Sequence, residues 1–191
     1  KPNDAPYKKG ARYTGKEHVW DEAFGYWGAA AHTLTLSPKE SYEVAKKKNL
    51  SAADYNGDGV VDAGTEMTYA HAYYASGFDK GGKTNYLDTV TRAFVEGRQV
   101  ITSSQGGKIG WVKRNRLKKN AAIICSNWEK VIAESVFKYA GSVYKDLEKL
   151  NTIMDANGNI DKVFRKYGKH WGELKGFSMA LQAGRKNLGE V

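Results

Sequence analysis

Residues 54 to 66 have the residue types and spacing of a calcium-binding loop. Oxygen ligands recur at alternate positions, and Gly59 falls where an EF-hand-type loop makes its sharp turn. The acid that closes such a loop is displaced by one residue, because Thr65 stands at the twelfth position and Glu66 follows it. The ligands that we predict for calcium are Asp54, Asn56, Asp58, Val60 (through its carbonyl), Asp62 and Glu66.

We expect calcium in this loop to be structural, since nothing in the flanking sequence indicates the opening helix pair of a calcium sensor. The alternative is a metal-free turn, which Asp, Asn and Gly also favour. A second segment, Asp155–Asp161, has similar residues but lacks the glycine and the closing acid of a calcium loop. We interpret this second segment as a turn.

The segment Glu17–Gly28 carries another group of ligand-type side chains. In a helix with about 100° per residue, Trp20, Phe24 and Trp27 fall on one face, which we predict to anchor the core. The opposite face carries His18, Asp21 and Glu22.

Helical bundles build metal sites from such His–carboxylate faces when facing helices add further acids or histidines. The residues that could complete a site lie in two later helical stretches and are Glu134, His170 and Glu173. Such a site would hold a metal or a small ligand, and nothing in the spacing selects a particular metal. A hydrogen-bonded structural contact explains the same spacing, and the sequence leaves both interpretations open.

Arg98 follows Gly97 in an otherwise apolar helical stretch. A guanidinium in that setting needs a carboxylate partner, and its planar donors suit a bidentate pair. We predict a structural ion pair from Arg98 to Asp21 or Glu22.

The chain is basic, with a net charge of +9 and a pI near 9.4. Lys108–Lys119 contains six Lys and Arg residues, one Trp and no acid. This run favours an acidic protein partner or an anionic surface, while a solvated helix start is the alternative. No signature of a nucleic-acid-binding module accompanies the run, so we do not expect a nucleic-acid partner.

Apolar residues recur at helical spacing through most of the chain, and strand signals are nearly absent. The sequence therefore predicts an all-α protein: one bundle of six or seven helices over residues 16–191, after a flexible leader over residues 1–15. No apolar run approaches the roughly 20 residues of a membrane span. The helices are expected at residues 15–32, 38–49, 65–76, 86–102, 111–150, about 161–167 and 170–183, and Asn85 is expected to cap the fourth.

The segment from His18 to Gly28, His-x-Trp-Asp-Glu-Ala-Phe-Gly-Tyr-x-Gly, resembles the signature of an uncharacterised bacterial domain family related to imelysin. The similarity extends, in order, to the Asp54–Asp62 loop, to Phe94-x-Glu-Gly-Arg98 and to His170-Trp-x-Glu-x-Lys-Gly-Phe177. It implies an imelysin-like helical bundle that is exported to the periplasm, the cell surface or a comparable compartment. We expect a targeting segment to have been removed, since the chain begins at Lys1.

Imelysin relatives carry a Gly-x-His-x-x-Glu motif, are linked to iron uptake and were once classed as peptidases. In this chain Gly15 precedes His18 by three residues rather than two, and Asp21 stands at the acid position. The resemblance implies iron or another transition metal as the ion that His18 and Asp21 would bind.

Three functional hypotheses follow from these observations. The first is an exported, non-enzymatic protein with a structural calcium loop that binds a metal or small ligand. The second is an interaction subunit that docks its basic surface on an acidic partner or envelope component. The third is a metal-dependent hydrolase, although no Gly-x-Ser-x-Gly, His-Glu-x-x-His or phosphate-loop motif is present. The oligomeric state is left open.

Overall fold

The computed structural model describes residues 3–104 and 106–184, and within these ranges the chain forms α-helices and no strand. The all-α prediction is therefore confirmed. The elements are α1 (Gly15–Trp27), the 3-10 helix η1 (Thr33–Thr35), α2 (Pro38–Ala45), α3 (Leu50–Ala53), α4 (Ala70–Asp79), α5 (Tyr86–Thr102), α6 (Trp111–Asp155) and α7 (Asp161–Gly184).

The chain divides into two compact units at the middle of α6, with residues 1–128 in unit 1 and residues 129–191 in unit 2. Each unit is described by itself below. The predictions of one domain and of a flexible leader stay predictions. Residues 3–14 contain turns and an isolated antiparallel bridge between Pro6 and Thr14.

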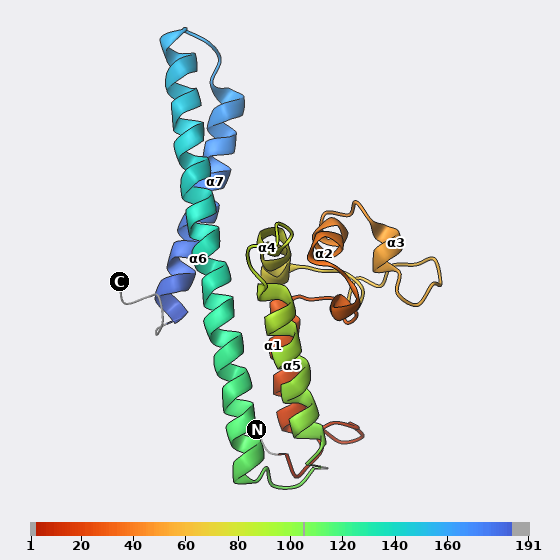
Figure 1. The fold of residues 1–191 in the computed structure, drawn as a ribbon. Helices are drawn as coiled ribbons and strands as arrows, with labels where there is room; N and C mark the ends of the chain where they lie inside the picture. The colour runs from red at the N-terminus through yellow and green to blue at the C-terminus, as the bar shows by residue number, and fades with distance from the viewer. Residues whose placement is uncertain (1–2, 105, 185–191) are drawn as a thin grey trace. The chain divides into compact units, whose positions relative to one another are not determined.

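In unit 1, α1 packs along α5 (Figure 1). Trp20 of α1 lies over Gly97 of α5, and its indole Nε1–H donates to the Phe94 carbonyl at 2.8 Å. A Cβ placed on Gly97 would lie 2.0 Å from the Trp20 ring, so the missing side chain is what lets the ring lie against the backbone. Phe94 meets the rings of Trp20 and Phe24 edge to face, as aromatic pairs prefer.

Trp27 completes the aromatic face of α1. It is fully buried and meets Trp128 edge to face, with ring centroids 5.1 Å apart. The aromatic face predicted from helical periodicity is therefore the face that packs in unit 1.

Helix α1 ends earlier than the predicted His32, because Gly28 adopts a left-handed conformation at φ 82° and terminates it. The chain then leaves α1 and returns at Tyr69, whose N–H donates to the Gly28 carbonyl at 2.7 Å. Between these points α2 and α3 form a small core of their own, built on Val44, Ala53 and Met67. The helix predicted from Thr65 begins only at Ala70.

Helix α5 is capped from a distance. The Asp79 carboxylate, only 3% exposed at the end of α4, accepts the Leu87 N–H and the Thr84 hydroxyl, each at 2.6 Å. The predicted cap residue Asn85 makes no side-chain capping bond.

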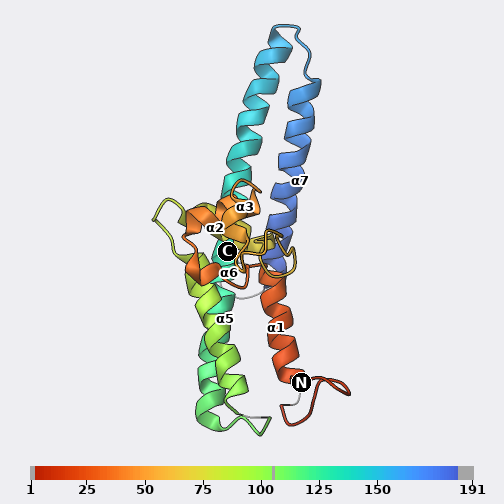
Figure 2. The same cartoon turned by 90° about the vertical axis from the view of Figure 1, so that its right-hand side faces the viewer.

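Unit 2 is an antiparallel hairpin of the later part of α6 and α7, which run alongside each other in both views (Figures 1 and 2). Tyr139 stacks on Phe177 with ring centroids 5.7 Å apart. Asn157, at φ 53°, turns the chain between the two helices, so the Asp155–Asp161 segment is a turn, as predicted. The two short helices predicted after it form one continuous helix, α7.

Among the described residues, no helix is both long enough and apolar enough to cross a membrane. Cys125, which its apolar neighbours in the sequence suggest is buried, is exposed on α6.

The tight contact between α1 and α5 can be tested with a pair of glycine substitutions. Gly97→Ala should lower the free energy of unfolding by about 3 kcal/mol, because the new methyl group overlaps the rigid Trp20 ring. Gly25→Ala is the matched control in α1: its Cβ meets nothing within 4 Å, so it should stabilise the protein by about 0.5–1 kcal/mol through helix propensity. Urea unfolding of both variants measures this, and equal effects would contradict the proposed contact.

Candidate functional site

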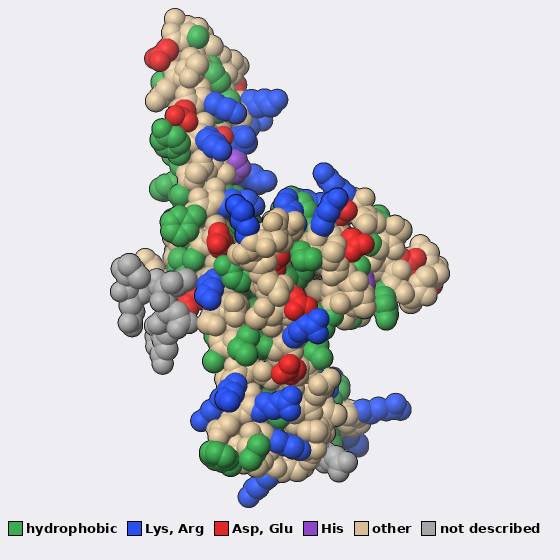
Figure 3. Space-filling view, viewed as in Figure 1, with side chains coloured by type: hydrophobic (Ala, Val, Ile, Leu, Met, Phe, Trp, Pro, Cys, Tyr) green, Lys and Arg blue, Asp and Glu red, His purple; other side chains and the backbone are tan. Residues whose placement is uncertain are grey.

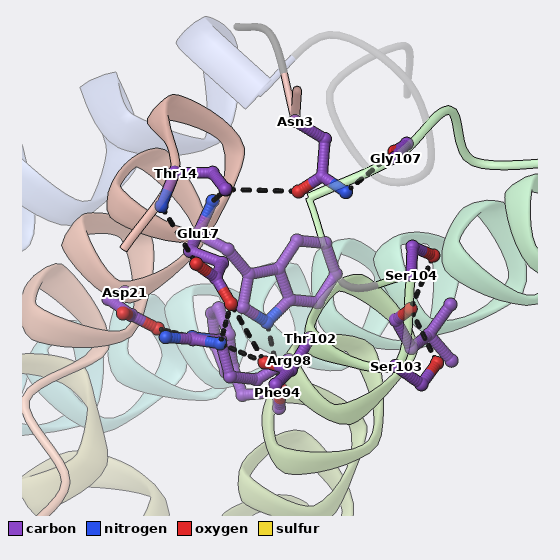
Figure 4. Close-up of polar contacts among 12 residues, drawn as sticks. Asn3, Thr14, Glu17, Asp21, Phe94, Arg98, Thr102, Ser103, Ser104 and Gly107 are labelled. Carbon is purple, nitrogen blue, oxygen red and sulfur yellow. Dashed lines mark hydrogen bonds and ion pairs between the residues drawn. The ribbon is translucent and has the colours of Figure 1, made fainter. Parts of the chain in front are cut away.

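The polar end of α1 contains a partly buried ion-pair network, in which Glu17 is buried and Asp21 is half exposed (Figure 4). Arg98 of α5 donates from Nη1 to Glu17 Oε1 at 2.6 Å and from Nε to Asp21 Oδ1 at 2.7 Å. Thr102 lies against Arg98 Nη1 and donates to Glu17 Oε1 at 2.9 Å. Arg98 therefore joins two acids of α1 to α5.

Glu17 is the centre of this network, and its side chain also caps its own helix. Its Oε2 accepts the Thr14 N–H at 2.8 Å, while the Thr14 hydroxyl accepts the Glu17 N–H, which makes a capping box. The Thr14 hydroxyl donates in turn to Asn3, whose amide donates to the Gly107 carbonyl. The network thus ties the N-terminal arm and the loop after α5 to α1.

Burial of Glu17 on its own would raise the pKa of its carboxyl. The hydrogen bonds from Thr14 and Thr102, together with the charge and hydrogen bond of Arg98, outweigh burial and hold the pKa below its usual value. Glu17 is therefore ionised at neutral pH, as its ion pair requires.

The predicted partners of Arg98 were Asp21 or Glu22, and the structure places Asp21 against it while Glu22 is exposed. Glu17 is not among the partners that the sequence predicts for Arg98. The signal that could have found it is the Thr14-x-x-Glu17 spacing, which marks a capping box and directs the carboxylate back to the helix start.

His18 lies outside this network. Its ring stacks on Tyr7 with centroids 3.7 Å apart and faces Tyr13 at 5.9 Å. Asp21 is held by a guanidinium and His18 by an aromatic stack, and metal binding by this pair stays a prediction.

The other three candidate ligands, Glu134, His170 and Glu173, belong to unit 2. His170 Nδ1 lies 2.6 Å from a carboxylate oxygen of Asp146, which is 2% exposed. Glu134 and Glu173 are half-buried. Across residues 3–104 and 106–184, no three or more His, Cys, Asp or Glu side chains form a group that could hold a metal ion.

The 54–66 loop is shaped by hydrogen bonds from its own backbone. Asp54 accepts the N–H groups of Gly57 and Gly59, each at 2.9 Å, and Asp58 accepts that of Val60 at 2.8 Å. Similar short-range bonds join Asn56 to the Asp58 N–H and Asp62 to the Gly64 N–H.

Glu66 closes the loop rather than facing solvent. It is 5% exposed, and its two oxygens accept the N–H groups of Tyr55, Asn56 and Asp62 at 2.8–3.3 Å. The acid one residue beyond the EF-hand position therefore braces both ends of the loop. Since a carboxylate has about four acceptor positions, the acids in the loop keep capacity for a further ligand.

The basic run Lys108–Lys119 forms the start of α6 and the loop before it. A cavity of about 410 Å³ opens here, lined by Lys16, Lys108 and Arg114 together with Asp4. A second hollow of about 390 Å³ lies along Ser103, Lys108 and Trp111. These hollows are cationic, in keeping with the charge of the run.

Comparisons of the chain with protein-family models, with curated proteins and with solved structures found no match.

The Glu17–Arg98 pair can be tested by removing the cation. Arg98→Ala should lower the free energy of unfolding by about 2 kcal/mol, because it leaves the Glu17 carboxylate buried without its counter-ion. Arg92→Ala is the matched control in the same helix, since Arg92 pairs with Asp88 at an exposed i, i+4 site, and it should leave the melting temperature nearly unchanged. Equal melting temperatures for the two variants would contradict a stabilising role for the network.

The lowered pKa of Glu17 predicts a pH dependence. The unfolded chain takes up the proton at the ordinary value near 4.5, and the folded chain only at a lower pH. The stabilisation is therefore complete above this value and is lost as the pH falls through the folded-state pKa. Glu17→Gln should flatten this acid limb in a series of unfolding measurements, and an unchanged limb would show that Glu17 does not contribute to it.

Proposed function

We propose that this chain is a non-enzymatic, exported helical binding protein whose 54–66 loop takes a structural calcium ion. The observation that carries the proposal is the order of the loop: Asp54, Asp58 and Asp62 each accept a hydrogen bond from a backbone N–H group within it. Asp54, Asp58 and Asp62 supply hard anionic oxygens, which suit calcium, and Gly59 adopts φ 81° at the sharp turn.

Calcium binding would require the loop oxygens to converge on the ion. The Asn56 amide now donates to Asp58 at 3.0 Å, and this bond has to yield for both oxygens to face an ion. Glu66 already holds Asp62 and Tyr55 together, so the loop ends are in place before binding. The ion would then contribute to stability through its preference for the folded loop.

The polar groups of α1 support a non-enzymatic role. Two acids of that helix, Glu17 and Asp21, are bound to Arg98, while Glu22 is exposed. The pKa of the Glu17 carboxyl is held below its usual value, which is opposite to the raised pKa of a general acid. The proposal of export rests on the imelysin-like resemblance, and extracellular calcium modules work at the high calcium levels found outside cells.

The calcium proposal predicts a metal-dependent melting temperature. Calcium added to chelator-treated protein should raise the melting temperature, and calorimetric titration should give one ion per chain. Asp58→Ala should abolish both effects, because Asp58 is exposed and carries a loop oxygen without belonging to the core. Asp88→Ala, which removes a half-buried acid outside the loop, is the control that should keep them. A melting temperature indifferent to calcium in the unmodified chain would refute the proposal.

A second candidate function is supported by the cationic end of unit 1. In this alternative, the chain is an interaction subunit that docks its basic surface on an acidic partner or an envelope component. The observation that favours it is the run of six cations beside two hollows, with Asp4 as the acid that lines one of them.

A further inference from the structure

The start of α6 combines exposed aromatic and aliphatic side chains with a dense positive charge. Trp111 and Val112, the first two residues of the helix, are 76% and 72% exposed. Figure 3 shows Lys and Arg side chains gathered around hydrophobic ones at the end of unit 1 where α6 begins. Large apolar side chains left in water at one spot, rimmed by polar groups, mark an interaction surface.

Helical spacing sorts the residues at this end into two faces. Trp111, Arg114 and Lys118 recur at three- and four-residue steps and are all exposed, so they form one outward stripe. Lys113 and Leu117 lie on the other side and are half-buried. Lys113 donates to the Ser103 carbonyl at 2.8 Å and fastens this end of α6 to the loop after α5.

No acid offsets the cations locally in the sequence. Residues 97–128 contain no Asp or Glu. Helix α1 adds Lys16 to the 410 Å³ cavity, and Asp4 is the acid that lines it. Like charges held this close favour a polyanionic surface that can neutralise several of them at once.

We propose that this end of unit 1, defined by Lys108, Trp111, Val112, Arg114 and Lys118, docks on an anionic phospholipid bilayer. The inference deepens the second candidate function and rests on it. Lipid phosphates meet the cations and fit the hollows beside Lys108, while Trp111 and Val112 enter the boundary between headgroups and acyl chains. Trp is enriched at that boundary because its ring is apolar and its N–H is polar.

The pairing of Trp111 with Val112 favours a bilayer over a nucleic acid. A base stacks on an indole, but an exposed valine beside it offers a base no stacking surface. A bilayer buries both side chains in the same event, and the surrounding lysines and arginines add attraction to anionic headgroups.

The experiment is sedimentation of the full chain with vesicles of phosphatidylglycerol and phosphatidylcholine in equal amounts, compared with vesicles of phosphatidylcholine alone. We expect binding to the anionic vesicles only, weakening as salt is added. The Arg114→Glu and Lys118→Glu double variant should lower the vesicle affinity by about 25-fold or more, since each basic residue near an anionic surface adds roughly five-fold.

Two controls separate this surface from general charge and general hydrophobicity. Lys39→Glu with Lys83→Glu makes the same change of charge at two exposed sites elsewhere in unit 1 and should bind nearly as tightly as the unmodified chain. Trp111→Ala should lower the affinity by about ten-fold, whereas Phe137→Ala, at a side chain that is 77% exposed in unit 2, should not.

Equal losses in the two charge variants, or no binding to anionic vesicles, would overturn the inference. So would binding of a single-stranded oligonucleotide, inorganic phosphate or an acidic polypeptide that depends on Arg114 and Lys118 while vesicles stay unbound. Binding of the acidic polypeptide alone would still support docking on an acidic partner and would exclude only the bilayer as that partner. None of these results changes the expected outcome of the calcium titration.

Discussion

The contact of Trp20 with the backbone at Gly97 is the constraint on which unit 1 depends. It sets how closely α1 and α5 approach, because the indole fills the space that a side chain at position 97 would take. The same ring donates its N–H to the Phe94 carbonyl, so the distance and the rotation of the two helices are fixed together. Arg98 follows Gly97 directly, and this register brings its guanidinium to Glu17 and Asp21.

The ion-pair network uses that register to join three parts of the chain. Glu17 is at once a helix cap, a counter-ion for Arg98 and an acceptor for Thr102. A buried carboxylate is costly unless it is satisfied in this way. Glu17 and Asp21 of α1 therefore hold the helix pair together.

The sequence predicts the helices well and their ends less well. Apolar periodicity finds α1, α5 and the long α6, because each buries one face against a neighbour. It misses the end of α1, since Gly28 interrupts a pattern that continues through apolar residues. It also misses the cap of α5, because Asp79 comes from another helix and capping scans look only at the residue before the helix.

For the candidate sites too, the sequence predicts some of the residues but not how they are arranged. Arg98 could be predicted because a charge in an apolar stretch needs a partner, but choosing between Asp21 and Glu22 needs the rotation of α1 against α5. Glu66 could be placed in the loop by spacing, yet its use as a brace depends on three backbone groups that no side-chain pattern displays. His18 stacks on the N-terminal arm, whose path has no sequence signal.

The backbone contact between Gly28 and Tyr69 marks where residues 29–68 leave and rejoin the rest of unit 1. The Ala31 N–H donates to the Thr65 carbonyl and the Tyr69 N–H to the Gly28 carbonyl, each at 2.7 Å, so the segment leaves and rejoins the scaffold at one place. The segment still packs on the scaffold, since α2 lies against α4 and η1 against α5. A change in its length is therefore accommodated best in the exposed part of the 54–66 loop, where closing a longer loop costs little. Residues 55–60 of the calcium-type loop are exposed, so the ligands that this part of the loop offers can change with little effect on α1 and α5.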